Sequence, residues 1–179
     1  MIEVPIRGPL HALPLHASAV VLDGGALLFL GPSGTGKSTV RGLLEGRAEA
    51  LADDAVFLRR RPDGRWGVSP ADGRAFLGPL PQEEAVALAA MPLRAFFRLY
   101  QAETPRLELL PSWEGCRFLT AAFFEAWWTQ YCDWPTQKRA FADLAEVART
   151  LPGYRFDFAR SSRTLEVLGE HLFQQEDHP

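Results

Sequence analysis

Ala26-Leu27-Leu28-Phe29-Leu30 runs directly into Gly31-Pro32-Ser33-Gly34-Thr35-Gly36-Lys37-Ser38-Thr39, and this stretch decides the fold. Its second part fits the phosphate-loop pattern GxxxxGK(S/T) at every fixed position. The apolar run before it is typical of a strand buried in the middle of a sheet. Val40, Leu43 and Leu44 then give the first apolar face of a helix. The sequence therefore predicts a strand, a phosphate-binding loop and a helix in direct succession.

The residue types of this motif suit a nucleotide. Glycines let successive backbone amides converge on phosphate oxygens, and the following helix points the positive end of its dipole at the same anion. We expect Lys37 to neutralise the β- and γ-phosphates of ATP, and the Ser38 hydroxyl to coordinate Mg²⁺. The alternative is an ordinary glycine-rich turn before a helix. The predicted nucleotide-binding residues are Gly31, Pro32, Ser33, Gly34, Thr35, Gly36, Lys37, Ser38 and Thr39.

Two carboxylates and a histidine lie at distances that can bring them back to this loop. Asp53 and Asp54 follow Lys37 by sixteen and seventeen residues, and His16 precedes Gly31 by fifteen. Adjacent carboxylates beside a metal–phosphate site offer one group for Mg²⁺ and one for accepting a hydroxyl proton. The alternatives are a solvated turn for the aspartates and a satisfied core or edge residue for the histidine. We predict Ser38 and Asp53 as metal ligands.

The first part of the chain predicts strands around the loop. Leu15–Leu22 and Ala26–Leu30, joined by Asp23-Gly24-Gly25, predict a hairpin. Ala55–Leu58 and Trp66–Val68 predict two further strands joined by a Pro-Asp-Gly turn. The segment from Ser69 to Pro81, rich in proline and glycine, predicts a loop or a lid-sized connection.

Beyond Gln82 the pattern is mainly helical. It predicts helices over 83–90, 118–131, 136–151 and 161–173, and strands over 107–110 and 154–158. We expect one domain over residues 1–179, with the sheet and nucleotide site in 1–81 and a mainly helical portion in 82–179. The predicted fold class is α/β, a phosphate-loop domain with a mixed, largely antiparallel sheet and a helical C-terminal half.

Composition narrows the classes of protein. The chain has 179 residues, of which 47% are hydrophobic and 23% charged, so it is not a disordered chain. The net charge is −3 and the 17 arginines are dispersed, which argues against nucleic acid as a partner. No apolar run approaches the roughly 20 residues of a bilayer span, so we expect a cytoplasmic protein without a membrane partner. We expect Cys116 and Cys132 to be free thiols.

Two further features have a plain structural interpretation. Phe123, Trp127 and Tyr131 recur at helical spacing and predict one buried helix face, with a neighbouring ring left for a partner or a second subunit of a homo-oligomer. The run Arg59-Arg60-Arg61 at a hairpin end predicts a solvated turn, with binding of an acidic acceptor as the alternative.

In combination, three features resemble a known family. His16, the loop Gly31–Ser38 and the sequence Ala52-Asp53-Asp54 are similar to the catalytic core of HPr kinase/phosphorylase and related serine kinases, whose nucleotide site resembles that of phosphoenolpyruvate carboxykinase. The resemblance covers about residues 16–58. It implies that Asp54 is the proton acceptor in phosphorylation and that His16 and Lys37 are further active-site residues. Glu83 and Glu84 are the loose candidates for the metal-binding glutamate of that family.

These observations favour an ATP- and Mg²⁺-dependent kinase that phosphorylates a serine-type hydroxyl of a protein, a peptide or a small molecule. The predicted catalytic residues are His16, Lys37, Asp53 and Asp54. Two alternatives are a nucleotide-binding regulatory module with weak or no hydrolysis and a phosphoserine phosphorylase or hydrolase. The acceptor and the choice among ATP, GTP and pyrophosphate as donor stay open at this point.

Overall fold

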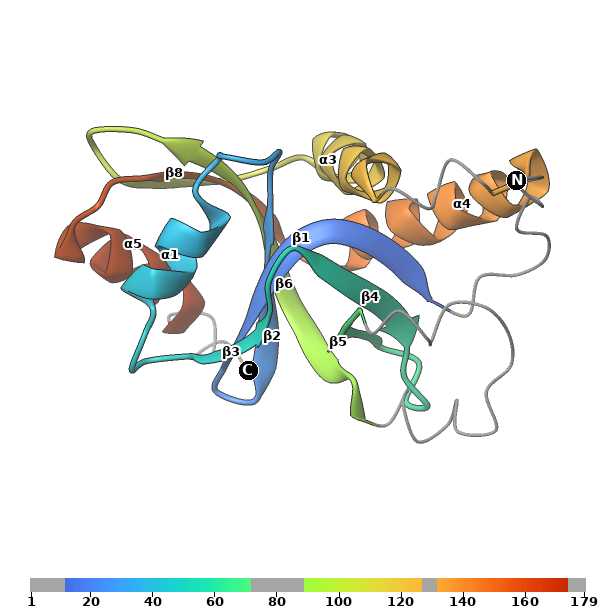
Figure 1. Ribbon diagram of the computed structural model, residues 1–179, viewed down its shortest axis with the longest axis horizontal. Coiled ribbons are helices and arrows are strands. Elements are labelled where there is room, and N and C mark those ends of the chain that lie inside the picture. Colours follow the sequence, from blue (N-terminus) through green and yellow to red (C-terminus); the bar gives the residue numbers. More distant parts are fainter. Residues whose placement is uncertain (1–11, 72–88, 127–131, 174–179) are drawn as a thin grey trace, which may run out of the picture.

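The protein has a mixed α/β fold, seen in a computed structural model that describes residues 12–71, 89–126 and 132–173 (Figure 1). Most of its strand pairs are antiparallel, and helices lie on both faces of the sheet. The strands are β1 (Leu13–Leu22), β2 (Gly25–Leu30), β3 (Glu49–Ala52), β4 (Ala55–Arg60), β5 (Trp66–Pro70), β6 (Met91–Gln101), β7 (Arg106–Leu109) and β8 (Gly153–Phe158). The helices are α1 (Lys37–Leu43), α3 (Ser112–Glu125), α4 (Trp134–Thr150) and α5 (Ser162–Phe173).

The predicted hairpin is formed by β1 and β2. The two strands pair antiparallel from Ala17 opposite Leu30 to Leu22 opposite Gly25. Asp23 and Gly24 both have positive φ, 48° and 72°, which is the backbone of a two-residue turn that fits the twist of the flanking strands. All six residues of β2 are buried, as its unbroken apolar sequence predicts.

Two long strands allow the sheet to close on itself. β1 pairs with β4 through its first residues and with β2 through its last, whereas β6 pairs with β5 at its start and with β2 and β8 further on. The path β2–β1–β4–β5–β6 therefore returns to β2. The pairs β2–β6 and β6–β8 are parallel, and the other pairs are antiparallel.

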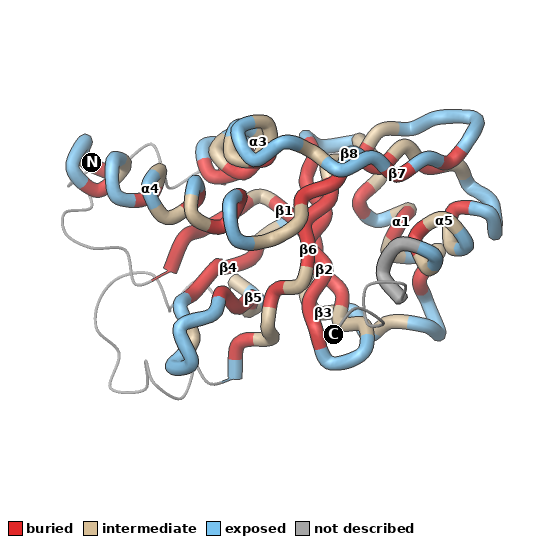
Figure 2. Tube along the Cα trace, turned by 180° about the vertical axis from the view of Figure 1, so that it is seen from behind, coloured by how far each residue is buried: buried red, intermediate tan, exposed pale blue. Residues whose placement is uncertain are grey.

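The alternation of side chains along these strands builds a core on each face of the sheet. On one face, Leu28 and Phe96 pack with residues of α3 and α4 such as Phe123 and Leu144. On the other face, the strands pack against α1 and α5. Both β2 and β6 run buried through the centre of the molecule (Figure 2). The loop between β2 and α1 emerges at the upper edge of the sheet in Figure 1.

Several predicted elements are confirmed with small shifts in their ends. The strands predicted over 107–110 and 154–158 and the helices predicted over 136–151 and 161–173 are β7, β8, α4 and α5. Both cysteines are free. In the described part of the chain, no helix has the length and hydrophobicity needed to cross a membrane.

The structure differs from the sequence prediction in several places. Strands β3 and β6 were not predicted, so the expectation of a mainly helical portion over 82–179 is incomplete. Ser69 and Pro70 belong to β5 and not to a loop. Helix α3 begins earlier than predicted and ends at Glu125, where Ala126 is already extended, so the spacing from Phe123 does not continue along this helix. Trp127 and Tyr131 lie outside the described residues.

The predicted solvated turn at Arg59-Arg60-Arg61 is wrong for Arg59, which is buried, and both Arg59 and the exposed Arg60 belong to β4. Arg59 is buried, with its guanidinium 5.1 Å from the centre of the Phe57 ring and its Nε donating to Ser69 Oγ at 3.1 Å. Arg60 lies 4.2 Å from the centre of the Trp66 ring. Both guanidinium groups are therefore held against aromatic rings of the hairpin.

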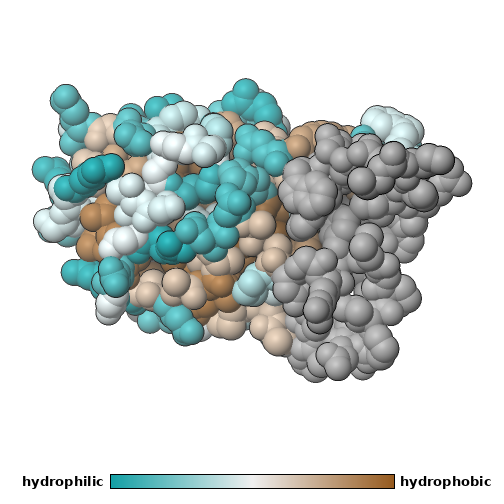
Figure 3. Space-filling view, viewed as in Figure 1, coloured by the Kyte–Doolittle hydropathy of each residue, from teal (hydrophilic) through white to brown (hydrophobic). Residues whose placement is uncertain are grey.

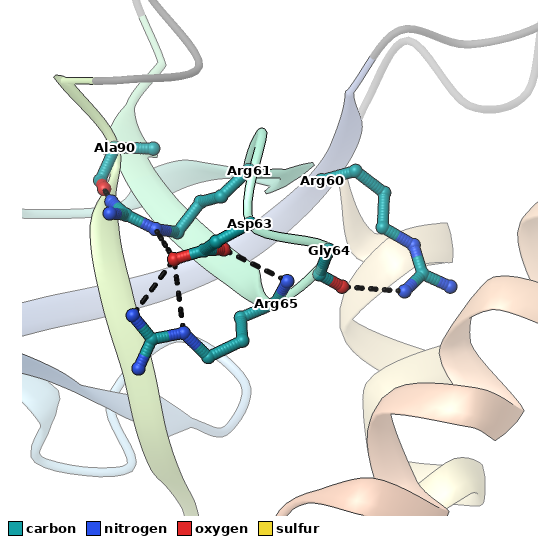
Figure 4. Close-up of polar contacts among 6 residues, drawn as sticks. All are labelled: Arg60, Arg61, Asp63, Gly64, Arg65 and Ala90. Carbon is teal, nitrogen blue, oxygen red and sulfur yellow. Dashed lines mark hydrogen bonds and ion pairs between the residues drawn. The ribbon is translucent and has the colours of Figure 1, made fainter.

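Carboxylates and carbonyl groups accept hydrogen bonds from the arginines Arg60, Arg61 and Arg65 of this hairpin (Figure 4). Arg60 donates to Gly64 O and pairs with Glu146 of α4, and Arg61 donates to Ala90 O. Asp63 accepts from Arg65, which lowers the pKa of the Asp63 carboxyl to about 2. Arg60, Arg61 and Arg65 thus each have a hydrogen-bond acceptor within or next to this hairpin.

Candidate functional site

The phosphate loop connects β2 to α1 as the sequence predicts. Gly34 and Gly36 have φ of 81° and 106°, values that side-chain-bearing residues rarely adopt. Thr35 closes the turn through its amide and hydroxyl, both of which donate to Pro32 O. Gly36 is the N-cap of α1 and offers no side-chain acceptor, so the first amides of this helix have no capping partner. Such amides suit the oxygens of a phosphate group.

Lys37 lies buried under the loop. Its Nζ donates to Gly31 O at 2.5 Å and to Pro32 O at 3.3 Å, which curls the side chain back beneath the loop. Burial lowers the pKa of Lys37, while Asp54, Glu125 and Asp53 oppose that shift. A desolvated ammonium without a carboxylate in contact gains more from a phosphate than a solvated one does.

His16 joins Lys37 to Asp54. Its Nε2 lies 2.9 Å from Lys37 Nζ, and its Nδ1 lies 3.3 Å from Asp54 Oδ1. Because an ammonium can only donate, Nε2 accepts, and the imidazole proton is assigned to Nδ1, facing the carboxylate. The side chain of Asp54 is 80% exposed and therefore accessible to a second reactant.

Sheet register explains why residues so distant in sequence meet here. His16 of β1 is paired with Ala55 of β4, which places it beside Asp54. Asp54 has a φ of 76°, and its carbonyl accepts from Ala17 N at 3.1 Å. A positive φ is uncommon for residues other than glycine, and aspartate tolerates it better than most. The turn between β3 and β4 thus holds the Asp54 carboxylate beside the phosphate loop.

Asp53 occupies a different environment. Its Oδ2 lies 2.9 Å from Nη2 of Arg41 in α1, an ion pair that holds it at the flank of the loop. Sequence reasoning placed Asp53 near the loop but did not find Arg41. In this arrangement Asp53 is engaged with a cation, whereas Asp54 is free of any arginine contact within the described residues.

A pocket of about 340 Å³ opens over these groups. It brings together most of the predicted loop residues, both aspartates, and two side chains that sequence analysis did not name. The lining residues are Ser33, Gly34, Gly36, Lys37, Ser38, Thr39, Asp53, Asp54, Gln101 and Arg160. His16 contacts two of these lining residues, Lys37 and Asp54. On the face shown in Figure 3, hydrophilic side chains dominate the region of α1 and α5, with smaller apolar areas between them.

Comparison with known proteins assigns the chain to a family. A family model described as SynChlorMet cassette protein ScmC matches residues 7–174, nearly the whole chain. The chain belongs to the ScmC family. No curated protein sequence matches this ScmC-family chain.

A solved structure, the Hpr(Ser) kinase/phosphatase from Coxiella burnetii, is similar to this ScmC-family chain. The identity is 16%, the match covers 91% of this chain and 89% of that chain, and the TM-score is 0.45. The family shown for this chain is that of ScmC, and the resemblance to HPr kinases stays an expectation from the sequence.

Gln101 and Arg160 were missed because they are far from the motif in sequence. Gln101 ends β6 and donates its side-chain amide to Gly34 O and Thr35 O at 3.2 and 3.4 Å, so it braces the loop. Arg160 follows β8 and lines the same pocket. β6 is the parallel neighbour of β2, the strand before the loop, and β6 ends beside the loop. Prediction of β6 as a strand would therefore have pointed to Gln101. Glu83 and Glu84 lie outside the described residues.

Proposed function

We propose that this protein is a kinase that binds ATP with Mg²⁺ and transfers the terminal phosphoryl group to a serine-type hydroxyl. The observation that carries this proposal is the chain of contacts from the loop through Lys37 and His16 to Asp54. It links a phosphate-binding ammonium to an accessible carboxylate. Nucleotide binding alone does not require the contact between His16 and Asp54.

The pocket supplies a complementary charge for a triphosphate. The uncapped amides at the start of α1 lie at this pocket, and Lys37 and Arg160 are the cations that line it. Gln101 holds the loop backbone and leaves the amides free to donate to phosphate oxygens. Such positioned donors act in a partly desolvated site, where they stabilise charge more than they would in water.

The residues present fit a magnesium ion. Ser38 and the two aspartates line one pocket. Hydroxyl and carboxylate oxygens suit Mg²⁺, which keeps several waters and takes phosphate oxygens among its ligands. Ser38 would hold the ion together with Asp53, directly or through water. When bound, the ion neutralises charge on the β- and γ-phosphates.

The proposed reaction is an in-line displacement at phosphorus. The acceptor hydroxyl gives its proton to an Asp54 carboxylate oxygen as its own oxygen forms a bond to the γ-phosphorus. The bond from that phosphorus to the β–γ bridging oxygen breaks, and ADP leaves with the electron pair. Lys37 and the loop amides stabilise the charge that develops on the departing phosphates. His16 orients the Asp54 carboxylate through its Nδ1 proton.

The pair Asp54→Asn and Asp53→Asn tests this assignment. Single-turnover transfer from ATP to a pool of serine peptides and to free serine is measured across a magnesium titration, and ATP affinity is measured separately by calorimetry. Loss of a general base costs about 10²–10⁴ in rate, so Asp54→Asn should stay slow at every magnesium concentration with nearly unchanged ATP affinity. Asp53→Asn should be rescued in part by high magnesium.

Three results would contradict the proposal in different ways. A wild-type rate in Asp54→Asn would exclude it as the base. Rescue of both variants by magnesium would mean that the two carboxylates share one metal site. Tight ATP binding without transfer to any hydroxyl would favour a regulatory module, and release of phosphate from phosphoserine without ATP would favour a hydrolase.

A further inference from the structure

Three arginines and two aromatic rings alternate across the sheet beside the phosphate loop. The Arg155 guanidinium lies 4.3 Å from the centre of the Tyr100 ring, and the Arg98 guanidinium lies 5.5 Å from the same ring. Arg98 also lies 5.1 Å from the centre of the Phe118 ring, which Arg117 approaches to 4.8 Å from α3. We call these five residues the arginine ladder. It connects β8, β6 and α3.

The arginine ladder lies next to the proposed site. Arg98 is paired in register with Leu30, the last residue before the phosphate loop. Tyr100 precedes Gln101, whose side chain holds the loop carbonyls. Arg98 and Glu125 at the end of α3 also both act on the pKa of Lys37, in opposite directions, which places them within electrostatic reach of its ammonium. An occupant of the ladder would therefore come close to the transferred phosphoryl group.

Two of the three cations are neutralised within the fold and the third is not. Arg117 pairs with Glu114 at 3.1 Å and Arg155 with Asp157 at 2.9 Å. No carboxylate of the described residues pairs with Arg98, and its Nε is buried without a hydrogen-bond partner. A buried donor left unpaired is costly, so such groups in native proteins usually serve a ligand or bind water.

The two rings restrict the guanidinium of Arg98. It lies 5.5 Å from the centre of the Tyr100 ring and 5.1 Å from the centre of the Phe118 ring, and these contacts limit the orientations open to it. A planar fork held in this way suits a carboxylate, which it can bind with two parallel hydrogen bonds.

We propose that the arginine ladder binds the phosphoryl acceptor and that this acceptor is a peptide with a glutamate or aspartate close to the phosphorylated hydroxyl. The acceptor part of this proposal rests on the proposed kinase function. The binding part does not, because it follows from Arg98 and its two rings alone.

A peptide is favoured over a nucleic acid by the charges along the ladder. Glu114 and Asp157 alternate with its arginines, so a continuous phosphate backbone would meet repulsion at each side of Arg98. An acidic peptide needs only one carboxylate at the centre. Trp113 lies one helical turn before Arg117 and is 67% exposed, which offers an apolar contact to a neighbouring peptide side chain.

Binding is tested with three fluorescently labelled serine peptides of matched length, flanked by glutamate, glutamine or lysine. Anisotropy is measured on the full chain with and without ATP and magnesium. A bidentate charged contact should favour the glutamate peptide over the glutamine peptide by about tenfold or more. Arg98→Gln should abolish that preference, and Arg98→Lys, which keeps charge but loses the fork, should retain part of it.

The matched control is Arg65→Gln, which removes one exposed arginine from the hairpin at the other end of the sheet. It should keep the preference, since the net charge then changes as in Arg98→Gln but the ladder does not. Circular dichroism and thermal melting verify that each variant is folded. Equal binding of the three peptides, equal loss in the control, or tighter binding of a single-stranded RNA probe than of the glutamate peptide would overturn the proposal.

Transfer assays separate this inference from the proposed function. If the glutamate peptide binds through Arg98 but no phosphoryl group reaches its serine, the kinase proposal fails and the binding surface stands. If serine peptides are phosphorylated at the same kcat/KM whatever their flanking charge, the kinase proposal stands and the ladder has no part in acceptor selection. A loss of ATP affinity in Arg98→Gln with unchanged peptide preference would reassign Arg98 to the nucleotide.

Discussion

The two ends of the sheet differ in which of their cations are paired with a carboxylate. In the β4–β5 hairpin, carboxylates or carbonyl groups accept from Arg60, Arg61 and Arg65 (Figure 4). At the edge that carries the phosphate loop, Lys37 donates to the carbonyls of Gly31 and Pro32. Neither Lys37 nor Arg160 has a carboxylate within ion-pair distance in the described residues, although the pocket they line holds two aspartates.

This difference separates cations that the fold pairs with a carboxylate from cations that it does not. A paired surface arginine contributes little charge to its surroundings and at most modest stability. A cation that the fold leaves unpaired, and partly desolvates, contributes binding energy once an anion arrives. The count of arginines in the sequence could not distinguish the two classes, because the difference lies in the partners.

Replacement of Lys37 should have the largest effect on phosphoryl transfer and on ATP binding. Lys37→Ala should reduce phosphoryl transfer by about 10³ or more and weaken ATP binding by at least about tenfold, because the buried ammonium at the phosphates is lost. Calorimetry with ATP and magnesium and single-turnover assays measure both. Arg60→Ala is the matched control. It should leave ATP binding unchanged and cost about 1 kcal/mol of stability from its ion pair and its stacking on Trp66.

Gly36→Ala should cost about 2–4 kcal/mol of stability and disable the loop. Its φ is 106°, and a Cβ there would collide with the ring of Phe158. Gly34→Ala also has a positive φ but open space around it, so we expect only about 1 kcal/mol. Chemical denaturation gives both values. Equal costs would show that backbone strain, and not the contact with Phe158, decides the choice of glycine.

Arg160→Ala should lower the transfer rate by about 10–10², because one charged donor to the phosphates is lost. Arg106→Ala is the control, since Arg106 is exposed and pairs with Glu108 on β7. Steady-state and single-turnover rates with a serine peptide provide the measurement. If the two variants behaved alike, Arg160 would belong with the paired, structural cations.

The smallest expected effect is the pH dependence of the hairpin. The pKa of Asp63 is lowered from 3.8 to about 2, chiefly by its hydrogen bonds with Arg65. A carboxyl whose pKa is lower in the folded state stabilises the fold above its unfolded pKa, and the stabilisation is lost as the pH falls toward 2. Asp63→Asn should therefore be slightly less stable than wild type at neutral pH, with the difference shrinking below about pH 4. Denaturation series at several pH values measure it, and a difference that grows in acid would contradict the assignment.

Much of the fold could be predicted because its signals are local. The apolar run before Gly31, the loop pattern and the turn at Asp23-Gly24 each depend on neighbouring residues, and the structure has β2, the loop, α1 and the hairpin at those positions. β6 escaped prediction because Pro92, Arg94 and Arg98 interrupt its apolar pattern, although it becomes a central strand. Arg98 lies 5.1 Å from the centre of the Phe118 ring of α3, and such a contact between distant segments cannot be recognised from spacing.

The same distinction between local signals and long-range contacts applies to the residues of the site. His16, Lys37 and Asp54 could be named from the sequence because the motif and its spacings are recorded along the chain. Arg41, Gln101 and Arg160 could not, because their positions depend on how helix and strand ends meet around the loop.

By itself, then, the sequence determined that the chain has a phosphate loop between a buried strand and a helix, since backbone torsions and hydrophobic periodicity are properties of consecutive residues. Only the tertiary structure decided that His16 bridges Lys37 and Asp54, that Asp53 pairs with Arg41, and which arginines are neutralised. Those outcomes depend on strand register and on the packing of distant segments, because charge–charge contacts form wherever the fold brings side chains together.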